Sequence, residues 1–129
     1  MDEAQQKKRI LVVEDEKYLR ELYLEILKDE GYEVVGAADG EEGFNAMKQG
    51  GFSLILLDIM LPKMDGISIL KKITETPPDK PNGSVVILSN LGQDNVIAEG
   101  ISLGAKGYMV KSDYTPDQVV TEVKNYLTQ

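Results

Sequence analysis

Short apolar runs alternate with amphipathic stretches along the chain. Apolar runs typical of strands buried inside a sheet occupy residues 10–13, 33–37, 53–57, 84–88 and 107–110. The helical spacing of apolar residues elsewhere predicts helices over 16–30, 41–49, after Asp65, over 95–103 and from Pro116 onward. Because parallel strands need crossover connections, this alternation indicates an α/β domain: a single doubly wound five-stranded parallel sheet with helices on both faces.

The residues at the expected helix ends agree with this division. Asp39 and Asp65 stand where a side chain can accept a hydrogen bond from the first helical turn. Gly31 and Gly104 stand where a helix commonly ends, and Pro116 suits a first turn. We therefore expect one folded domain over residues 9–129, preceded by a disordered tail over residues 1–8.

The composition excludes several classes of chemistry. The chain has 129 residues and contains neither cysteine nor histidine, which rules out disulfides, thiolate zinc sites and imidazole catalysis. Any bound metal must have oxygen ligands, which favours Mg²⁺, with Mn²⁺ possible as a substitute. The formal net charge of −8 disfavours direct contact with nucleic acid, because phosphate backbones attract basic surfaces.

Two targeting patterns are missing from the sequence. No apolar run approaches the roughly 20 residues that span a bilayer, and the polar opening segment does not resemble a signal peptide. We therefore expect a cytoplasmic protein without a membrane segment. The sequence leaves open whether the chain is a stand-alone domain or part of a longer protein.

Charged and hydroxyl side chains follow four of the predicted strands. Glu14 and Asp15 follow the first strand, Asp58 the third, Ser89 the fourth and Lys111 the fifth. Ligands of doubly wound sheets bind beyond the carboxyl ends of the strands, so we expect these side chains to meet. Adjacent carboxylates need a compensating cation, an aspartate can attack phosphorus, and lysine and serine can bind phosphate oxygens. The pattern favours phosphoryl transfer.

Each of these residues also has an ordinary structural explanation. The acidic pair at 14–15 suits the start of a helix, and Asp58 can simply end a strand before a turn. Ser89 suits a turn, Lys111 suits a solvated surface, and Tyr108 suits packing within a strand. The phosphoryl-transfer hypothesis depends on their joint placement.

The same residues lie in segments that resemble one family. ILVVEDE (10–16), LILLDIMLPKMDG (54–66), VVILSN (85–90) and GAKGYMVK (104–111) resemble the receiver domains of two-component response regulators, including stand-alone chemotaxis-type receivers. The resemblance runs from about residue 8 to the end of the sequence. It implies a (βα)5 flavodoxin-like fold with strand order 2-1-3-4-5.

The resemblance also implies roles for the residues at the strand ends. Asp58 would accept a phosphoryl group from a sensor histidine kinase or a histidine phosphotransfer protein. Glu14, Asp15, Asp58 and the backbone carbonyl of Met60 would hold Mg²⁺. Such a domain is a signalling domain that catalyses its own phosphoryl transfer and slow autodephosphorylation, rather than an enzyme acting on other molecules.

A switch follows from the same resemblance. Ser89 and Lys111 would bind phosphoryl oxygens, and Tyr108 would swing inward as Ser89 moves. The surface of the fourth helix, fifth strand and fifth helix would then change and bind a downstream protein partner. Physically, a new charge of about −1.5 to −2 would bias a two-state element.

Some positions depart from the family pattern. Ser112 replaces a proline, and a cis peptide before serine would cost about 2.5–4 kcal/mol, which favours trans at 111–112 without deciding it. The pair at 106–107 lacks the acidic residues of winged-helix regulators, so we expect a monomer or a weak phosphorylation-dependent dimer. Met60 and Leu91 are apolar and orient water poorly, which predicts a long-lived phosphorylated state.

Two other functions compete with a phosphorylated receiver. A phosphatase of the haloacid-dehalogenase type also uses an aspartate nucleophile, but it needs a second aspartate where this chain has Met60. A pseudo-receiver that is never phosphorylated typically loses an acidic residue or the lysine, and this chain keeps them all. Nucleotide binding has no support, because neither common glycine-rich phosphate motif occurs.

Overall fold

Five strands and five α-helices alternate along the chain in the computed structural model, which describes residues 7–90 and 92–128. The strands are β1 (Arg9–Val13), β2 (Glu33–Ala37), β3 (Leu54–Asp58), β4 (Ser84–Ser89) and β5 (Gly107–Val110). The helices are α1 (Lys17–Asp29), α2 (Gly40–Gln49), α3 (Gly66–Glu75), α4 (Asp94–Ser102) and α5 (Pro116–Leu127). Most of the expected tail lies outside the described residues, and residues 7–8 precede β1 without regular structure.

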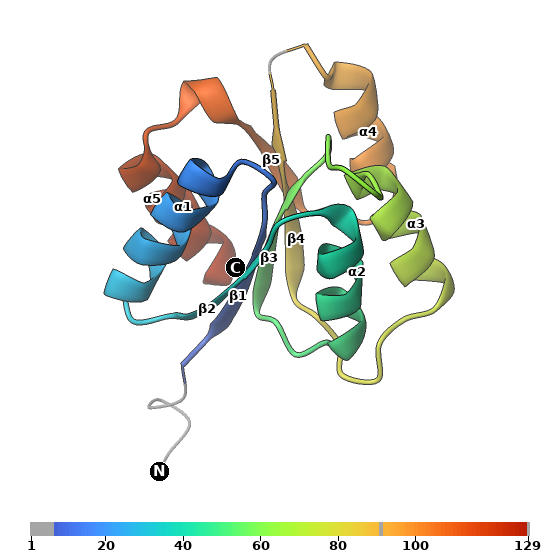
Figure 1. The fold of residues 1–129 in the computed structure, drawn as a ribbon, viewed down its shortest axis with the longest axis horizontal. Helices are drawn as coiled ribbons and strands as arrows, with labels where there is room; N and C mark the ends of the chain where they lie inside the picture. Colours follow the sequence, from blue (N-terminus) through green and yellow to red (C-terminus); the bar gives the residue numbers. More distant parts are fainter. Residues whose placement is uncertain (1–6, 91, 129) are drawn as a thin grey trace.

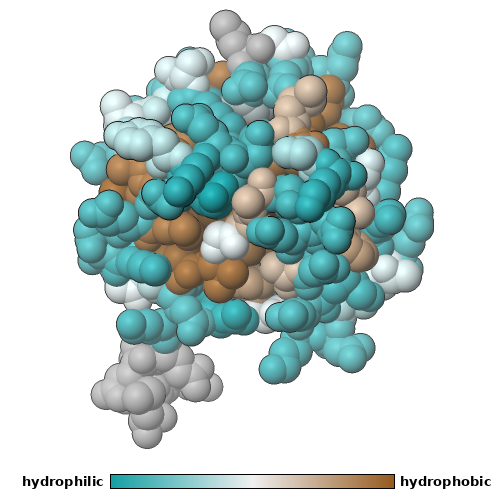
Figure 2. Space-filling view, in the orientation of Figure 1, coloured by the Kyte–Doolittle hydropathy of each residue, from teal (hydrophilic) through white to brown (hydrophobic). Residues whose placement is uncertain are grey.

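The strands form one parallel sheet in the order β2-β1-β3-β4-β5. Helices α1 and α5 cover one face, and α2, α3 and α4 cover the other (Figure 1). The predicted doubly wound architecture and strand order are confirmed. Figure 2 shows hydrophilic residues over most of one side of the molecule, with apolar residues near its centre.

The strands are apolar because both faces of the sheet are covered. Successive β1 residues point to opposite sides: Ile10 and Val12 pack with the residues of α1 and α5, whereas Leu11 and Val13 pack toward α2 and α3. Every residue of β3 is buried. Burying one such side chain stabilises the fold by about 1.5–3 kcal/mol, so the central strands give the residues at their ends a rigid support.

The helix ends confirm most of the sequence predictions. Asp39 accepts a hydrogen bond from the amide of Glu42, and Asp65 accepts one from the amide of Ser68. The structural explanation of residues 14–15 as a helix cap is wrong. The N-cap of α1 is Glu16, whose side chain makes no capping bond.

The loop after β3 is fixed by close backbone contact with the start of α2. The amide of Gly40 donates to the carbonyl of Pro62, and a Cβ atom at Gly40 would lie 1.5 Å from the carbonyl oxygen of Met64. Only glycine permits this approach without moving the backbone. Lys63, between these contacts, has a φ of 70°. The loop that follows Asp58 is therefore held in one position by the first residue of α2.

Candidate functional site

The carboxylates that follow β1 and end β3 converge at the carboxyl edge of the sheet. Val13 pairs with Leu57, so the residues that come next, Glu14 and Asp58, lie side by side. Glu14, Asp15 and Asp58 each offer an oxygen, and these oxygens all lie within 4.8 Å of one another. Asp15 is exposed, whereas Glu14 and Asp58 are buried. This group of three is called the acidic cluster below.

Lys111 places a positive charge against the acidic cluster. Its Nζ atom lies 2.9 Å from Asp58 Oδ2 and 2.5 Å from Glu14 Oε1, and its side chain is 16% exposed. Burial lowers the pKa of Lys111, but the contacts with Glu14 and Asp58 outweigh burial and leave that pKa raised. Lys111 therefore stays an ammonium ion, and its explanation as a solvated surface lysine is wrong.

Lys111 reaches the acidic cluster from a short 3-10 turn after β5, Lys111–Asp113. All peptide bonds of the described residues are trans, including the bond between Lys111 and Ser112. The sequence left this bond undecided. A trans bond before Ser112 is thus compatible with contact between the ammonium group and Asp58.

Glu14 carries the least satisfied polar atom of the acidic cluster. Its Oε2 atom accepts a hydrogen bond from the amide of Glu16, whereas its buried Oε1 atom has no hydrogen-bond donor besides the ion-pair contact with Lys111. Burial raises the pKa of Glu14, and Lys111 and the Glu16 amide only partly offset it. Three carboxylates beside one lysine leave a net negative charge, so the acidic cluster can accept a further cation through its oxygens.

Asp58 has one partner for each carboxylate oxygen. Oδ1 accepts a hydrogen bond of 3.3 Å from the amide of Met60, and Oδ2 accepts one of 2.9 Å from Lys111. Asp58 is 2% exposed, while the Met60 side chain beside it is 58% exposed. The carboxylate is thus held in a fixed orientation just below the surface.

Ser89 and Tyr108 lie on the neighbouring strands. Ser89 is buried at the end of β4, and its hydroxyl donates to the carbonyl of Met109 over 3.5 Å, a long and therefore weak bond. Tyr108 lies on β5 opposite Ile87 and is 50% exposed. The structure thus brings the acidic cluster and Lys111 into contact, while the Ser89 hydroxyl points to β5 and Tyr108 faces outward.

Two features of the site have no counterpart in the sequence predictions. The first is Arg20, on α1, whose guanidinium donates to the carbonyls of Glu14 and Asp15. Its signal in the sequence is an arginine one turn into the helix that follows the acidic pair. That signal is ambiguous, because arginines on helices are usually solvated.

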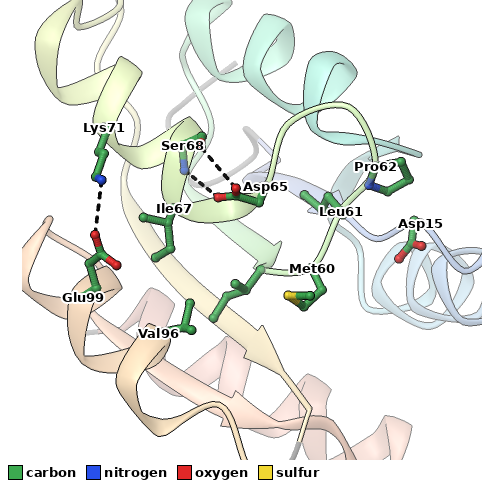
Figure 3. A pocket seen from close by; sticks show the side chains of 11 residues that line it. Asp15, Met60, Leu61, Pro62, Asp65, Ile67, Ser68, Lys71, Val96 and Glu99 are labelled. Carbon is green, nitrogen blue, oxygen red and sulfur yellow. Dashed lines mark hydrogen bonds and ion pairs between the residues drawn. The ribbon is translucent and has the colours of Figure 1, made fainter.

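The second is a cavity of about 650 Å³ between the loop after β3, α3 and α4. Asp15 and Met60 line one end, and the ion pair of Lys71 with Glu99, 3.3 Å long, lies at the other (Figure 3). Apolar side chains such as Val96 line the cavity between these ends. Its walls come from segments far apart in the sequence, so no local pattern could predict it.

The fold and the site define a flavodoxin-like α/β domain with an acidic cluster and a lysine at the carboxyl edge of its sheet. Residues 10–124 match the family described as response regulator receiver domain. The chain belongs to this family, whose members serve as phosphoacceptor domains in signalling. The family match decides against the haloacid-dehalogenase alternative.

Individual relatives agree with this assignment. The chemotaxis protein CheY of Treponema pallidum is 45% identical over 107 residues, which cover 80% of this chain and 72% of that protein. The transcriptional regulatory protein DltR of Streptococcus agalactiae is 37% identical over 116 residues, 90% of this chain, and the chain spans only 50% of DltR. A CheY-like receiver domain of Methanospirillum hungatei superposes with a TM-score of 0.83 at 29% identity, covering 95% of both chains.

Membership of the family sets the general role of the chain. Receiver domains of response regulators interact with histidine kinases and with downstream targets. No helix in the described part of the chain is both long and apolar enough to cross a bilayer.

Proposed function

We propose that Asp58 is the phosphoacceptor of this receiver domain. The observation that carries the proposal is its position: Asp58 ends the central strand β3, and its carboxylate contacts the Lys111 ammonium inside the acidic cluster. Glu14 contacts the same lysine but follows the neighbouring strand β1, whereas Asp15 lacks a lysine contact among the described residues. Asp58 alone combines a fixed orientation, a cationic partner and a neighbouring exposed loop.

The reaction is a transfer between two nucleophiles. A carboxylate oxygen of Asp58 attacks phosphorus in the phosphohistidine of a sensor histidine kinase or a histidine phosphotransfer protein. An O–P bond forms, the N–P bond breaks, and the imidazole of the donor leaves with the electron pair. Lys111 moves from Asp58 Oδ2 to a phosphoryl oxygen and keeps the added charge paired. The same domain slowly releases phosphate to water.

The oxygen ligands of the site suit Mg²⁺, with Mn²⁺ as a substitute. Glu14, Asp15, Asp58 and the backbone carbonyl of Met60 would hold the ion, with Glu14 acting directly or through water. The fit rests on the close approach of three carboxylates, whose negative charges exceed the single positive charge of Lys111. When bound, the ion supplies positive charge against the phosphoryl oxygens.

Ser89 and Tyr108 provide the switch in this proposal. The hydroxyl of Ser89 gives up a bond of only 3.5 Å when it turns toward a phosphoryl oxygen, so the turn costs little. Tyr108 is half exposed on the adjacent strand and moves inward into the space that opens beside Ser89. This movement changes the face formed by α4, β5 and α5, where a downstream protein docks.

The folded domain spans residues 9–129, acts in the cytoplasm, and is a monomer or a weak phosphorylation-dependent dimer. Its partners are proteins rather than nucleic acid or membrane, in keeping with a net charge of −8.

Binding of beryllofluoride, a phosphoryl mimic, with Mg²⁺ tests the proposal. Wild-type protein is expected to bind beryllofluoride and Mg²⁺ together. The Asp58→Asn variant is expected to bind beryllofluoride and Mg²⁺ much more weakly than wild type. Asp79→Asn, a change at an exposed aspartate in the loop before β4, is the matched control and should bind like wild type. Equal binding by the Asp58→Asn variant would refute the proposal, and absence of binding by wild type would indicate a pseudo-receiver.

A further inference from the structure

Arg20 makes the contacts from which a further role follows. Its Nη1 atom donates to the backbone carbonyl of Glu14 over 2.8 Å and to that of Asp15 over 3.4 Å. These two residues supply two of the three carboxylates of the acidic cluster. Arg20 lies on α1, behind the loop, and touches the backbone of the cluster rather than its carboxylates.

The loop between β1 and α1 is held from two sides. On the sheet side, the amide of Glu14 donates to the carbonyl of Ala37 at the end of β2. On the helix side, Arg20 binds both carbonyls. Within the described residues, the bond from Arg20 is the one hydrogen bond made by the Asp15 backbone. This bond is long, so Arg20 holds the Glu14 carbonyl more firmly and positions Asp15 mainly through the peptide bond that joins the two residues.

Strand β2 makes room for Arg20. A Cβ atom at Gly36 would lie 2.9 Å from Leu24 Cδ1 and 3.4 Å from Arg20 Cδ. Because Gly36 carries no side chain, α1 packs closely against β2, and the aliphatic part of Arg20 lies over the strand. The guanidinium is thereby brought to the carbonyls at the end of β1.

We infer that Arg20 is a positioning residue for the divalent-cation site, holding the Glu14 and Asp15 backbone so that their carboxylates converge with Asp58. This inference rests on the proposed metal site. Both bonds come from one nitrogen, Nη1, whose two N–H groups lie in the plane of the guanidinium and therefore point in fixed directions, unlike the rotating N–H groups of a lysine. Outer partners that fix the ligands of a metal typically change affinity by about 10–100-fold when removed.

Charge and geometry make different predictions for a lysine at this position. If Arg20 acted only through its positive charge, Arg20→Lys would behave like wild type, and Arg20→Ala would bind a cation more tightly because repulsion is lost. If Arg20 acts by holding both carbonyls, Arg20→Ala weakens binding and Arg20→Lys recovers only part of the loss. The two mechanisms therefore predict opposite changes in cation affinity for Arg20→Ala.

Calorimetric titration with Mn²⁺, without any phosphodonor, separates these outcomes. We expect Arg20→Ala to bind Mn²⁺ about tenfold more weakly than wild type, and Arg20→Lys to lie between them. Arg9→Ala is the matched control, because it removes an arginine whose side chain makes its own contacts, an ion pair and a cation–π contact, at the opposite end of β1. It should bind Mn²⁺ like wild type.

Urea unfolding in the presence of a chelator supplies the second readout. A purely structural role would lower the unfolding free energy of Arg20→Ala and leave the Mn²⁺ affinity of its folded fraction unchanged, which would overturn the inference. An Arg20→Lys variant that binds Mn²⁺ as tightly as wild type would also overturn the inference. If Arg20→Ala does not fold, the Arg20→Lys variant alone decides the test. If wild type itself binds no Mn²⁺, the proposed metal site fails; if only the Arg20 variants are unaffected, this inference fails alone.

Discussion

The Lys111 ammonium lies 2.9 Å from Asp58 Oδ2 and joins the end of β5 to the end of β3 across the intervening strand β4. The same ammonium lies 2.5 Å from Glu14, so one cation serves two buried carboxylates. The contact keeps these negative charges paired before any phosphoryl group arrives. It also explains how an acidic cluster can persist inside a folded domain.

Replacing Lys111 should destabilise the protein strongly. Lys111→Met leaves two buried carboxylates without their cation, and removal of one partner from a buried pair typically costs about 3–5 kcal/mol. We expect a loss near the lower end of this range, because Lys111 is partly exposed. Urea unfolding at neutral pH measures the change.

Lys71→Met is the control for this substitution. Lys71 pairs with Glu99 on the surface, and exposed pairs contribute less than about 1 kcal/mol. Mg²⁺ should restore more stability to Lys111→Met than it adds to wild type, because it would replace the missing charge. Equal losses of unfolding free energy in the two lysine variants would show that the contact of Lys111 with Asp58 contributes no more than an exposed ion pair.

The lowered pKa of Asp39 predicts a pH dependence away from the acidic cluster. The hydrogen bond from the Glu42 amide is the main cause of the lowered pKa, and Lys63 adds to it. A carboxyl group whose pKa is lowered in the folded state stabilises the protein at pH values above its ordinary pKa of 3.8. That contribution disappears as the pH falls through the lowered pKa.

Asp39→Asn tests whether this contribution to stability is lost as the pH falls. The variant keeps an acceptor for the cap but carries no charge. Wild type should be the more stable protein at neutral pH, and the difference should shrink on acidification below pH 3.8. Thermal unfolding at a series of pH values checks it. A difference that stays constant through this range would contradict the assigned cause.

Gly40 should tolerate no side chain. Gly40→Ala places a Cβ atom 1.5 Å from the Met64 carbonyl oxygen, so the loop after β3 must move. We expect a loss of about 3 kcal/mol. Gly31→Ala is the control, because that Cβ meets nothing within 4 Å and its φ of 95° costs only about 1–2 kcal/mol. Equal stability of the two variants would contradict the described packing.

Met60 should influence the lifetime of the phosphorylated state. Its exposed apolar side chain adjoins Asp58 and cannot orient an attacking water. Met60→Asn adds polar atoms there, and we expect hydrolysis to become about tenfold faster, less than a fully positioned general base would give. Loss of the phosphoryl group with time measures the rate. A wild-type lifetime of seconds with Mg²⁺ present would refute the long-lived state.

The sequence predicted the fold well because the central strands β1, β3 and β4 are largely buried on both faces. Such strands are nearly continuous apolar runs, as in Leu54–Leu57, and the predicted ends differ from the structure by at most one residue. The clustering of residues at strand ends could also be predicted, because a parallel sheet brings all its carboxyl ends to one edge.

The side-chain contacts could not be predicted in the same way. Nothing in the local sequence shows that Lys111 reaches both Glu14 and Asp58, or that Arg20 turns back to the loop before its helix. These contacts depend on how α1 and the loop after β5 pack on the sheet. The role of Glu16 as the N-cap of α1, in place of the acidic pair before it, is likewise decided by packing.

Mapping the phosphorylated residue tests the central claim most directly. Wild-type protein is incubated with a phosphorylated histidine kinase and Mg²⁺, digested at low pH, and analysed by tandem mass spectrometry. One phosphoryl group should be found on Asp58, and Asp58→Asn should acquire none. A phosphoryl group on Glu14 or Asp15, or undiminished labelling of the Asp58→Asn variant, would contradict the account.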